Sequence, residues 1–502
     1  MKKLLMVLAI FAFVLPAFAA TYYVDPAYPP GGNGTPGWPF DTIGEALAYA
    51  TSSGDTVVCA AGNYSEGIDL FTGTPGHDGV TVMGAGQGIS NIPGQVSFNQ
   101  TDSAIVTGFT INNSVTFDGD TASVLSDCEV VGGSGISLIS GSSGVVTGCD
   151  IHDNSVGVTC DNSAGAIDAS SIYRSSGSGI VHTGSDASQS AGCDIYENGA
   201  DGILAEGSST PTSNGNIIEN NTANGIHVEG SADMTSDGDI CQTNQANGFY
   251  MEGSSQATIS NLTSQTNTMN GLYIEGSAYA GTINNCTIQQ NTLHGIWIDS
   301  GATASILIEN TDASQNSQSG IVFGTPMKSG RVRPATTAVS LAGDSAPVSL
   351  SNLGDGGYAP LALTVELDTL TVENNSGTGM TFNDNNTYKV WDCDIMGNDL
   401  GVTIGTGANP DLGGGAQSSV GGNDISDNAS RDFINNSASN VYAKNNDWTA
   451  SAETEMSGEH PDTVDVTLID DYWENSSWGY VMWDDFGGGA VEETTWGQLK
   501  AM

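Results

Sequence analysis

The residues of this chain that could do chemistry recur at one spacing. A glycine followed by a hydrophobic residue returns every 22 to 25 residues, and we count positions in each repeat from that glycine as zero. Position +4 is usually acidic, and position +2 is aromatic in four later repeats. The acidic row comprises Asp161, Glu206, Glu229, Glu252, Glu275 and Asp299, and the aromatic row comprises His227, Tyr250, Tyr273 and Trp297.

Both rows are expected on one side of a strand, because alternate residues of an extended chain point the same way. Successive repeats would place equivalent side chains about 5 Å apart. Aromatic rings flanked by carboxylates suit a neutral sugar chain, whose apolar ring faces lie on the aromatic faces while its hydroxyls bond to the acids. The aromatic row therefore predicts a polysaccharide-binding groove.

The acidic row also permits catalysis or cation binding. Carboxylates about 5–5.5 Å apart occur in retaining glycosidases and those about 6.5–9.5 Å apart in inverting ones, so Glu229, Glu252, Glu275 and Asp299 are candidate catalytic residues. Glu206, Glu229, Glu252 and Glu275 repel one another, and Ca²⁺ would relieve that repulsion. A duplicated repeat with a solvating acid produces the same spacing, and the residues leave these readings open.

A second candidate lies in the basic segment Lys328, Arg331 and Arg333. A polysaccharide lyase needs such a side chain to take the proton beside a uronate, usually with Ca²⁺ on the carboxylate. The simpler reading is a basic loop that balances an acidic surface. The sequence contains no Gly-x-Ser-x-Gly, Cys-x-x-Cys, His-Glu-x-x-His or phosphate-loop pattern, and we favour a non-catalytic protein.

The elements that position these residues follow from the period. Polar, glycine-rich repeats of this length are typical of a solenoid of short stacked strands, with positions +1 and +3 in the core. His182 occupies position +3, which favours a buried histidine over a metal ligand. Cysteines in a Cys-x-Ile/Val context are expected to be buried thiols, at Cys128, Cys149, Cys193, Cys286 and Cys393. Recurrent asparagines predict an internal hydrogen-bonded stack, at Asn154, Asn198, Asn221, Asn244, Asn267, Asn291, Asn316, Asn375 and Asn398.

The N-terminal part has a different pattern. Apolar residues at helical spacing between Phe40 and Ser53, after a capping box of Thr42 and Glu45, predict a helix. The segment Thr56 to Ala60 reads as a strand. We expect the helix to cap the open end of the solenoid, whose first strand would otherwise be an unpaired edge.

This region resembles secreted right-handed parallel β-helix proteins of the pectate-lyase-like superfamily. The resemblance rests on Tyr22-Tyr23-Val24-Asp25-Pro26, Gly37-Trp38-Pro39-Phe40-Asp41-Thr42-Ile43, Gly54-Asp55-Thr56-Val57-Val58 and Ala61-Gly62-Asn63-Tyr64. It implies an all-β, right-handed parallel β-helix with an N-terminal capping helix. It does not imply one activity, because the superfamily includes lyases, hydrolases, epimerases and proteins without a known reaction.

Composition and termini complete the sequence-based expectations. The net charge of −47 disfavours nucleic acid and anionic lipid, and favours a polysaccharide, a cell-surface glycan or cations as partners. The apolar run after Lys2 and Lys3 reads as a bacterial signal peptide, so we expect the protein to be secreted, periplasmic or at the cell surface, with no membrane span. We also expect it to be a monomer. The expected divisions are a signal peptide at 1–19, an entry and capping helix at 20–60, a β-helix at 61–448 with a protruding loop near 325–338, a closing segment at 449–486 and a flexible tail at 487–502.

Overall fold

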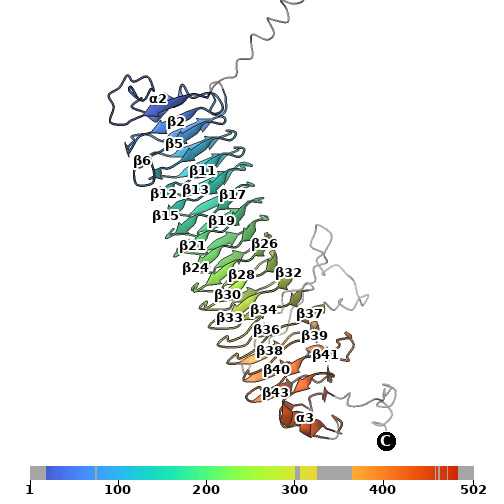
Figure 1. Ribbon diagram of the computed structural model, residues 1–502. Coiled ribbons are helices and arrows are strands. Elements are labelled where there is room, and N and C mark those ends of the chain that lie inside the picture. Colours follow the sequence, from blue (N-terminus) through green and yellow to red (C-terminus); the bar gives the residue numbers. More distant parts are fainter. Residues whose placement is uncertain are drawn as a thin grey trace, which may run out of the picture. The chain divides into compact units, whose positions relative to one another are not determined.

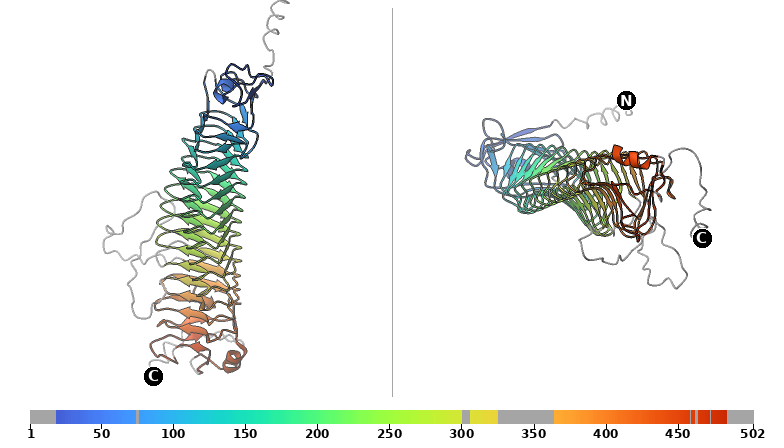
Figure 2. Two further views of the ribbon diagram at one scale, coloured as in Figure 1. Left: turned by 90° about the vertical axis from the view of Figure 1, so that its left-hand side faces the viewer. Right: turned by 90° about the horizontal axis from the view of Figure 1, so that it is seen from below.

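The protein is described from a computed structural model that covers residues 19–73, 76–299, 306–324, 364–457, 459–461, 464–471 and 473–483. The chain forms two compact units, Met1–Thr235 and Ser236–Met502, and each is described by itself. Within each unit, short strands are stacked in rows (Figure 1), and Figure 2 shows these rows from two other sides. The predicted signal peptide apart from its last residue, the loop near 325–338 and the tail at 487–502 lie outside the described residues.

The first unit consists of three rows of parallel strands, with one strand of each row in a typical coil. The first row contains β1 (Thr21–Val24), β2 (Thr56–Cys59), β5 (Thr81–Met83), β8 (Ile105–Thr107), β11 (Val124–Ser126), β14 (Val145–Thr147), β17 (Ala166–Asp168), β20 (Gln189–Ala191) and β23 (Thr212–Asn214). The second row contains β4 (Ile68–Phe71), β7 (Val96–Asn99), β10 (Val115–Asp118), β13 (Ile136–Ile139), β16 (Val158–Asp161), β19 (Ile180–Thr183), β22 (Ile203–Ala205) and β25 (Ile226–Val228). The third row contains β3 (Gly62–Asn63), β6 (Ser90–Ile92), β9 (Thr110–Ile111), β12 (Glu129–Val131), β15 (Asp150–His152), β18 (Ser171–Tyr173), β21 (Asp194–Tyr196) and β24 (Ile217–Glu219).

The second unit repeats this arrangement after β26 (Asp233–Asp237). One row contains β29 (Gln256–Ser260), β32 (Tyr279–Asn284), β35 (Leu307–Glu309), β37 (Thr364–Asp368), β39 (Thr387–Trp391), β41 (Asn409–Gly413), β44 (Val441–Ala443) and β47 (Val481–Met482). Another contains β28 (Phe249–Met251), β31 (Leu272–Ile274), β34 (Ile296–Ile298), β36 (Ile321–Phe323), β38 (Thr378–Phe382), β40 (Leu400–Ile404), β43 (Arg431–Asn435) and β46 (Ile469–Asp470). The remaining elements are β27 (Ile240–Gln242), β30 (Thr263–Gln265), β33 (Thr287–Gln289), β42 (Asp424–Ile425), β45 (Asp447–Trp448) and the helix α3 (Ala450–Met456).

The recurrent glycine is required by the close approach of neighbouring coils. A Cβ atom built on Gly202 would lie 2.3 Å from Cγ2 of Ile218, and one built on Gly271 would lie 2.2 Å from Cγ2 of Ile288. Such distances are far below a normal contact between carbon atoms. Any side chain here would therefore separate the coils, which explains why the glycine recurs with the period of the fold.

The predicted core positions are confirmed. The hydrophobic residue after each repeated glycine and the residue two positions later are buried in every repeat from Ile136 to Phe323. All eight cysteines are buried and free of disulfide bonds, including the five in the Cys-x-Ile/Val context. They therefore act as small apolar side chains in the interior.

The predicted asparagine stack is also present, but Asn154 lies outside it, because its Nδ2 donates to the Val130 carbonyl at 2.9 Å. In the second unit, Nδ2 of Asn267 donates to Oδ1 of Asn291 at 3.0 Å, and Nδ2 of Asn291 donates to Oδ1 of Asn316 at 3.1 Å. The same contact continues to Asn375, Asn398 and Asn428. In the first unit it joins Asn198 to Asn221 at 3.0 Å. These amides provide partners for one another where water is excluded.

The sequence analysis missed a second polar row, at the residue before the repeated glycine. Asn270 donates its side-chain amide to Asn247 at 3.0 Å, and the backbone N–H of His294 donates to Oδ1 of Asn270 at 3.1 Å. In the first unit, Asn224 donates to Asp201 at 2.9 Å. In these coils a second set of hydrogen bonds between neighbours therefore runs beside the asparagine stack.

The N-terminal helix is shorter than expected. The helix α2 spans Ile43–Leu47, and the Thr42 hydroxyl accepts a hydrogen bond from the Glu45 N–H at 3.2 Å. Its apolar side chains are buried and the strand β2 forms as expected. That this helix caps the solenoid stays a prediction. Within the described residues, no helix is long and apolar enough to cross a membrane.

Candidate functional site

The second unit brings three residues of the predicted aromatic row into register. Tyr250 on β28 pairs with Tyr273 on β31, and Tyr273 pairs with Trp297 on β34. The ring centroids of Tyr250 and Tyr273 lie 5.3 Å apart and those of Tyr273 and Trp297 lie 4.5 Å apart, each with planes inclined by 19°. Both faces of Tyr273 are therefore covered by its neighbours. The rings present their edges and polar atoms outward, whereas the sequence-based interpretation placed sugars on their faces.

Two acids of the predicted row are bound to the first ring of this stack. The Tyr250 hydroxyl lies 3.1 Å from Oε2 of Glu252 and also hydrogen-bonds Oε2 of Glu275, from the next coil. Burial raises the pKa of Tyr250, and the neighbouring Glu275 and Glu252 carboxylates raise it further. The hydroxyl therefore stays protonated at neutral pH and donates a hydrogen bond to this carboxylate pair.

The end of the stack is held by the backbone. The indole N–H of Trp297 donates to the carbonyl of Gly324 at 3.0 Å. Burial raises the pKa of Tyr273, with further contributions from the charges of Glu275 and Asp299. We call the surface formed by Tyr250, Tyr273, Trp297, Glu252 and Glu275 the aromatic–acidic face.

The other predicted members lie in the first unit. His227, on β25, places Nδ1 3.3 Å from the Asp201 carboxylate and Nε2 3.8 Å from Glu229. Burial alone would raise the pKa of Asp201, but its bonds to His227 and Asn224 outweigh burial and lower it. Glu206 follows β22 and is half-buried. Lys328, Arg331 and Arg333 lie outside the described residues.

A second aromatic stack, missed by the sequence analysis, occurs in the third row of the first unit. His152 stacks on Tyr173 with centroids 4.9 Å apart, and Tyr173 stacks on Tyr196 at 4.8 Å. The Arg174 guanidinium lies 4.8 Å from the centre of the Tyr173 ring and bonds Asp153 at 2.8 Å. These rings recur 21 and 23 residues apart, so their spacing was a signal that could have revealed them.

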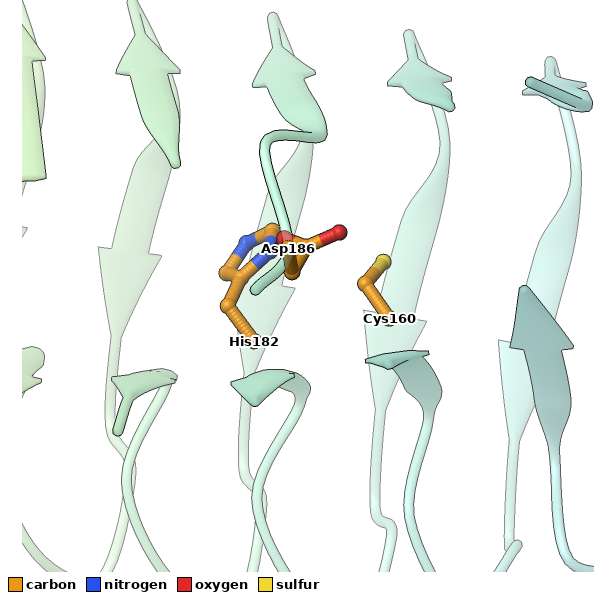
Figure 3. Close-up of side chains that lie close together, drawn as sticks. All are labelled: Cys160, His182 and Asp186. Atoms are coloured by element: carbon orange, nitrogen blue, oxygen red, sulfur yellow. Dashed lines mark hydrogen bonds and ion pairs between the residues drawn. The ribbon is translucent and has the colours of Figure 1, made fainter. Parts of the chain in front are cut away.

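The interior of the first unit contains an unusual polar cluster. Cys160 on β16, His182 on β19 and Asp186 in the following turn are all at most 1% exposed. Each offers a ligand atom, and these three atoms lie within 4.8 Å of one another. Figure 3 shows Cys160 on the coil next to the one that carries His182 and Asp186, with an Asp186 carboxylate oxygen pointing to its side. The prediction that His182 is buried is confirmed, but the sequence did not reveal its two neighbours.

Hydrogen bonds hold the carboxylate of this cluster. Oδ2 of Asp186 lies 2.7 Å from Nδ1 of His182, and Oδ1 accepts hydrogen bonds from the Ser163 and Ser188 hydroxyls, both at 2.7 Å. Burial alone would raise the pKa of Asp186, but His182 and the two serines outweigh burial and lower it. Asp186 is therefore a fully buried carboxylate that stays ionised.

Comparison with known proteins agrees with the architecture. The family model described as "Right handed beta helix region" matches residues 94–240 and 247–325. No curated protein matches the sequence significantly.

The solved structures that match this chain are distant from it in sequence and in structure. The A-module of the Azotobacter vinelandii mannuronan C-5 epimerase AlgE4 is 16% identical over 60% of this chain and 91% of its own, with a TM-score of 0.42. The pectate lyase Pel9A is 19% identical over 59% of this chain and 79% of its own, with a TM-score of 0.37. The catalytic unit of a GH87 alpha-1,3-glucanase from Streptomyces thermodiastaticus strain HF3-3 is 15% identical over 82% of this chain and 69% of its own, with a TM-score of 0.33. The family match over residues 94–240 and 247–325 and the parallel register of the coils agree with the expected right-handed parallel β-helix fold.

Proposed function

We propose that this protein is an exported, non-catalytic β-helix protein that binds a neutral polysaccharide along the aromatic–acidic face. The observation that carries the proposal is the in-register row of Tyr250, Tyr273 and Trp297 beside carboxylates of the same coils. Equivalent groups repeat at the coil spacing of about 4.8 Å, which is close to the length of one hexose unit. A polymer along the row would therefore meet similar groups at successive sugars.

The binding mode follows from the way the rings are packed. Both faces of Tyr273 and one face each of Tyr250 and Trp297 are covered by neighbouring rings, so a sugar chain would contact ring edges and form hydrogen bonds with the Glu252 and Glu275 carboxylates. Carboxylates accept hydrogen bonds from sugar hydroxyls, and hydrogen bonds to charged groups are stronger than neutral ones. A net charge of −47 repels acidic polymers, which favours a neutral one.

The test is retention on a panel of immobilised neutral and acidic polysaccharides, with and without Ca²⁺. The double variant Tyr273→Ala/Trp297→Ala removes two rings of the row, and we expect it to lower the affinity tenfold or more, about 1.4 kcal/mol. The matched control is Tyr173→Ala/Tyr196→Ala, which disrupts the other aromatic stack and should leave retention unchanged. Equal retention by both variants and the wild type would place recognition elsewhere.

The alternative is a polysaccharide-degrading enzyme, either a glycoside hydrolase or a lyase, acting at the same face. It is favoured by one observation, the contact of Glu252 and Glu275 from adjacent coils with a single hydroxyl. Paired carboxylates are the catalytic groups of most glycosidases. Product release from a bound polysaccharide, lost in Glu252→Gln and Glu275→Gln variants that still bind it, would establish hydrolysis. Retention without products supports the binding protein.

A further inference from the structure

We propose that the buried cluster of Cys160, His182 and Asp186 is a binding site for one zinc ion, acquired while the coil folds. Thiolate, imidazole and carboxylate are the usual protein ligands of Zn²⁺. The three ligand atoms lie within 4.8 Å of one another, and ligand atoms around a tetrahedral zinc lie about 3–4 Å apart. Small side-chain movements would therefore bring them to a common ion.

The ligands come from two adjacent coils. Cys160 and His182 are paired residues of β16 and β19, and Asp186 follows β19 in the turn. The next residue of the same row is Ala205, on β22. A metal bound here would join one coil to the next in the interior, as the asparagine stack does elsewhere.

Charge supports a cation at this position. Asp186 is 0% exposed, and a buried carboxylate is costly unless hydrogen bonds or a cation compensate it. One Zn²⁺ with the Cys160 thiolate and the Asp186 carboxylate gives a site of zero net charge. The Ser163 and Ser188 hydroxyls on Oδ1 would orient the carboxylate, which is the role of the second layer of residues around a bound metal.

An independent observation concerns the imidazole. Nε2 of His182 is buried and has no hydrogen-bond partner among the described residues. The hydrogen bonds of the cluster therefore leave the imidazole incompletely satisfied, which is unusual for a buried polar group. A metal-free His182–Asp186 hydrogen bond is the competing description of the site.

Metal binding requires Cys160 to lose its proton and the ligating nitrogen of His182 to carry none. Burial raises the pKa of the Cys160 thiol, and the Asp186 charge raises it further. Zn²⁺ replaces the thiol proton and forms a bond to the sulfur, while the imidazole binds as a neutral ligand, so at least one proton is released for each ion bound. Uptake should therefore be favoured by higher pH.

The experiment uses the full chain, unfolded in guanidinium with a chelator and refolded with Zn²⁺, with Co²⁺ or with chelator alone. Metal outside the core is then removed with chelator, and metal content is measured by mass spectrometry. We expect about one ion per chain in the wild type and in the control Cys149→Ala, whose thiol is also buried but is not part of the cluster. Cys160→Ala and Asp186→Asn should each retain less than about a tenth of that amount.

The Co²⁺ form provides a readout that does not depend on the variants folding. A wild-type protein refolded with Co²⁺ should show a thiolate-to-cobalt charge-transfer band and the visible absorption of tetrahedral cobalt. It should also unfold at a higher temperature with Zn²⁺ than after refolding with chelator. A wild type that retains no metal, or a Cys160→Ala variant that retains as much as the wild type, would overturn the proposal.

Discussion

The backbone N–H of Ser319 donates a hydrogen bond to Nδ1 of His294 across 3.2 Å. His294 is only 8% exposed and stands edge-on to Trp297. In the same polar row, the equivalent position is occupied by Asn270 in the preceding coil and by Asn247 in the coil before that. His294 therefore acts as an acceptor in the row, and only the form without a proton on Nδ1 can do so.

Stability should depend on pH through His294. Burial lowers its pKa from 6.5 to about 4, so protonation favours the unfolded chain. The contribution of neutral His294 to the free energy of unfolding is complete above the unfolded pKa of about 6.5 and is lost as the pH falls towards 4. The loss reaches about 1.4 kcal/mol per pH unit and amounts to about 3 kcal/mol in all. In His294→Asn this dependence should disappear. Chemical unfolding of both proteins across this range measures the difference, and identical pH profiles would contradict the assignment.

Substitutions in the asparagine stack should be among the most destabilising in the second unit. Asn267 donates to Cys241 O and Asn291 Oδ1 and accepts from the backbone N–H of Asn244. In Asn267→Ala these buried groups lose their partners, and we expect a loss of about 2–4 kcal/mol in the free energy of unfolding. The control is Gln265→Ala, because the Gln265 side chain bonds Gln242 in an outward row where water can replace it. A loss of similar size in both variants would show that the interior stack has no special role.

The thiols should be protected in the native protein. Cys149, Cys193 and Cys286 are at most 2% exposed. Burial raises the pKa of Cys193 and Cys286 to about 11, so almost no reactive thiolate is present at neutral pH. Labelling of these residues, mapped by peptide mass spectrometry, should be slow without denaturant and fast in guanidinium. Fast labelling of the native protein would contradict the inward register.

The acidic row should make stability sensitive to cations. Glu252 and Glu275 share contact with one hydroxyl, so screening by salt or binding of Ca²⁺ should relieve their repulsion and raise the melting temperature. In Glu252→Gln/Glu275→Gln we expect a smaller response to both. The matched control is Glu366→Gln, an exposed acid on β37 outside the row. If melting of the wild type is indifferent to Ca²⁺ and salt, the row only solvates the surface.

The sequence by itself determined the coil, the core and the buried asparagines. Each depends on one residue type at one period: Gly202 and Gly271 because no side chain fits between the coils, and Asn267 because its amide meets an equivalent amide one coil away. Period and strand alternation are properties of the backbone, so they can be read from residue order.

The tertiary structure alone decided which side chains touch. The rings of Tyr250 and Trp297 cover the two faces of Tyr273. The strand register predicted that these residues are neighbours, but it did not predict how their rings are oriented. Asp186 meets His182 and Cys160 because it lies in a turn that bends back over the core, outside the strand alternation. Side-chain torsions and turn geometry are set by packing against the adjacent coil, and for that reason neither contact could be derived from spacing.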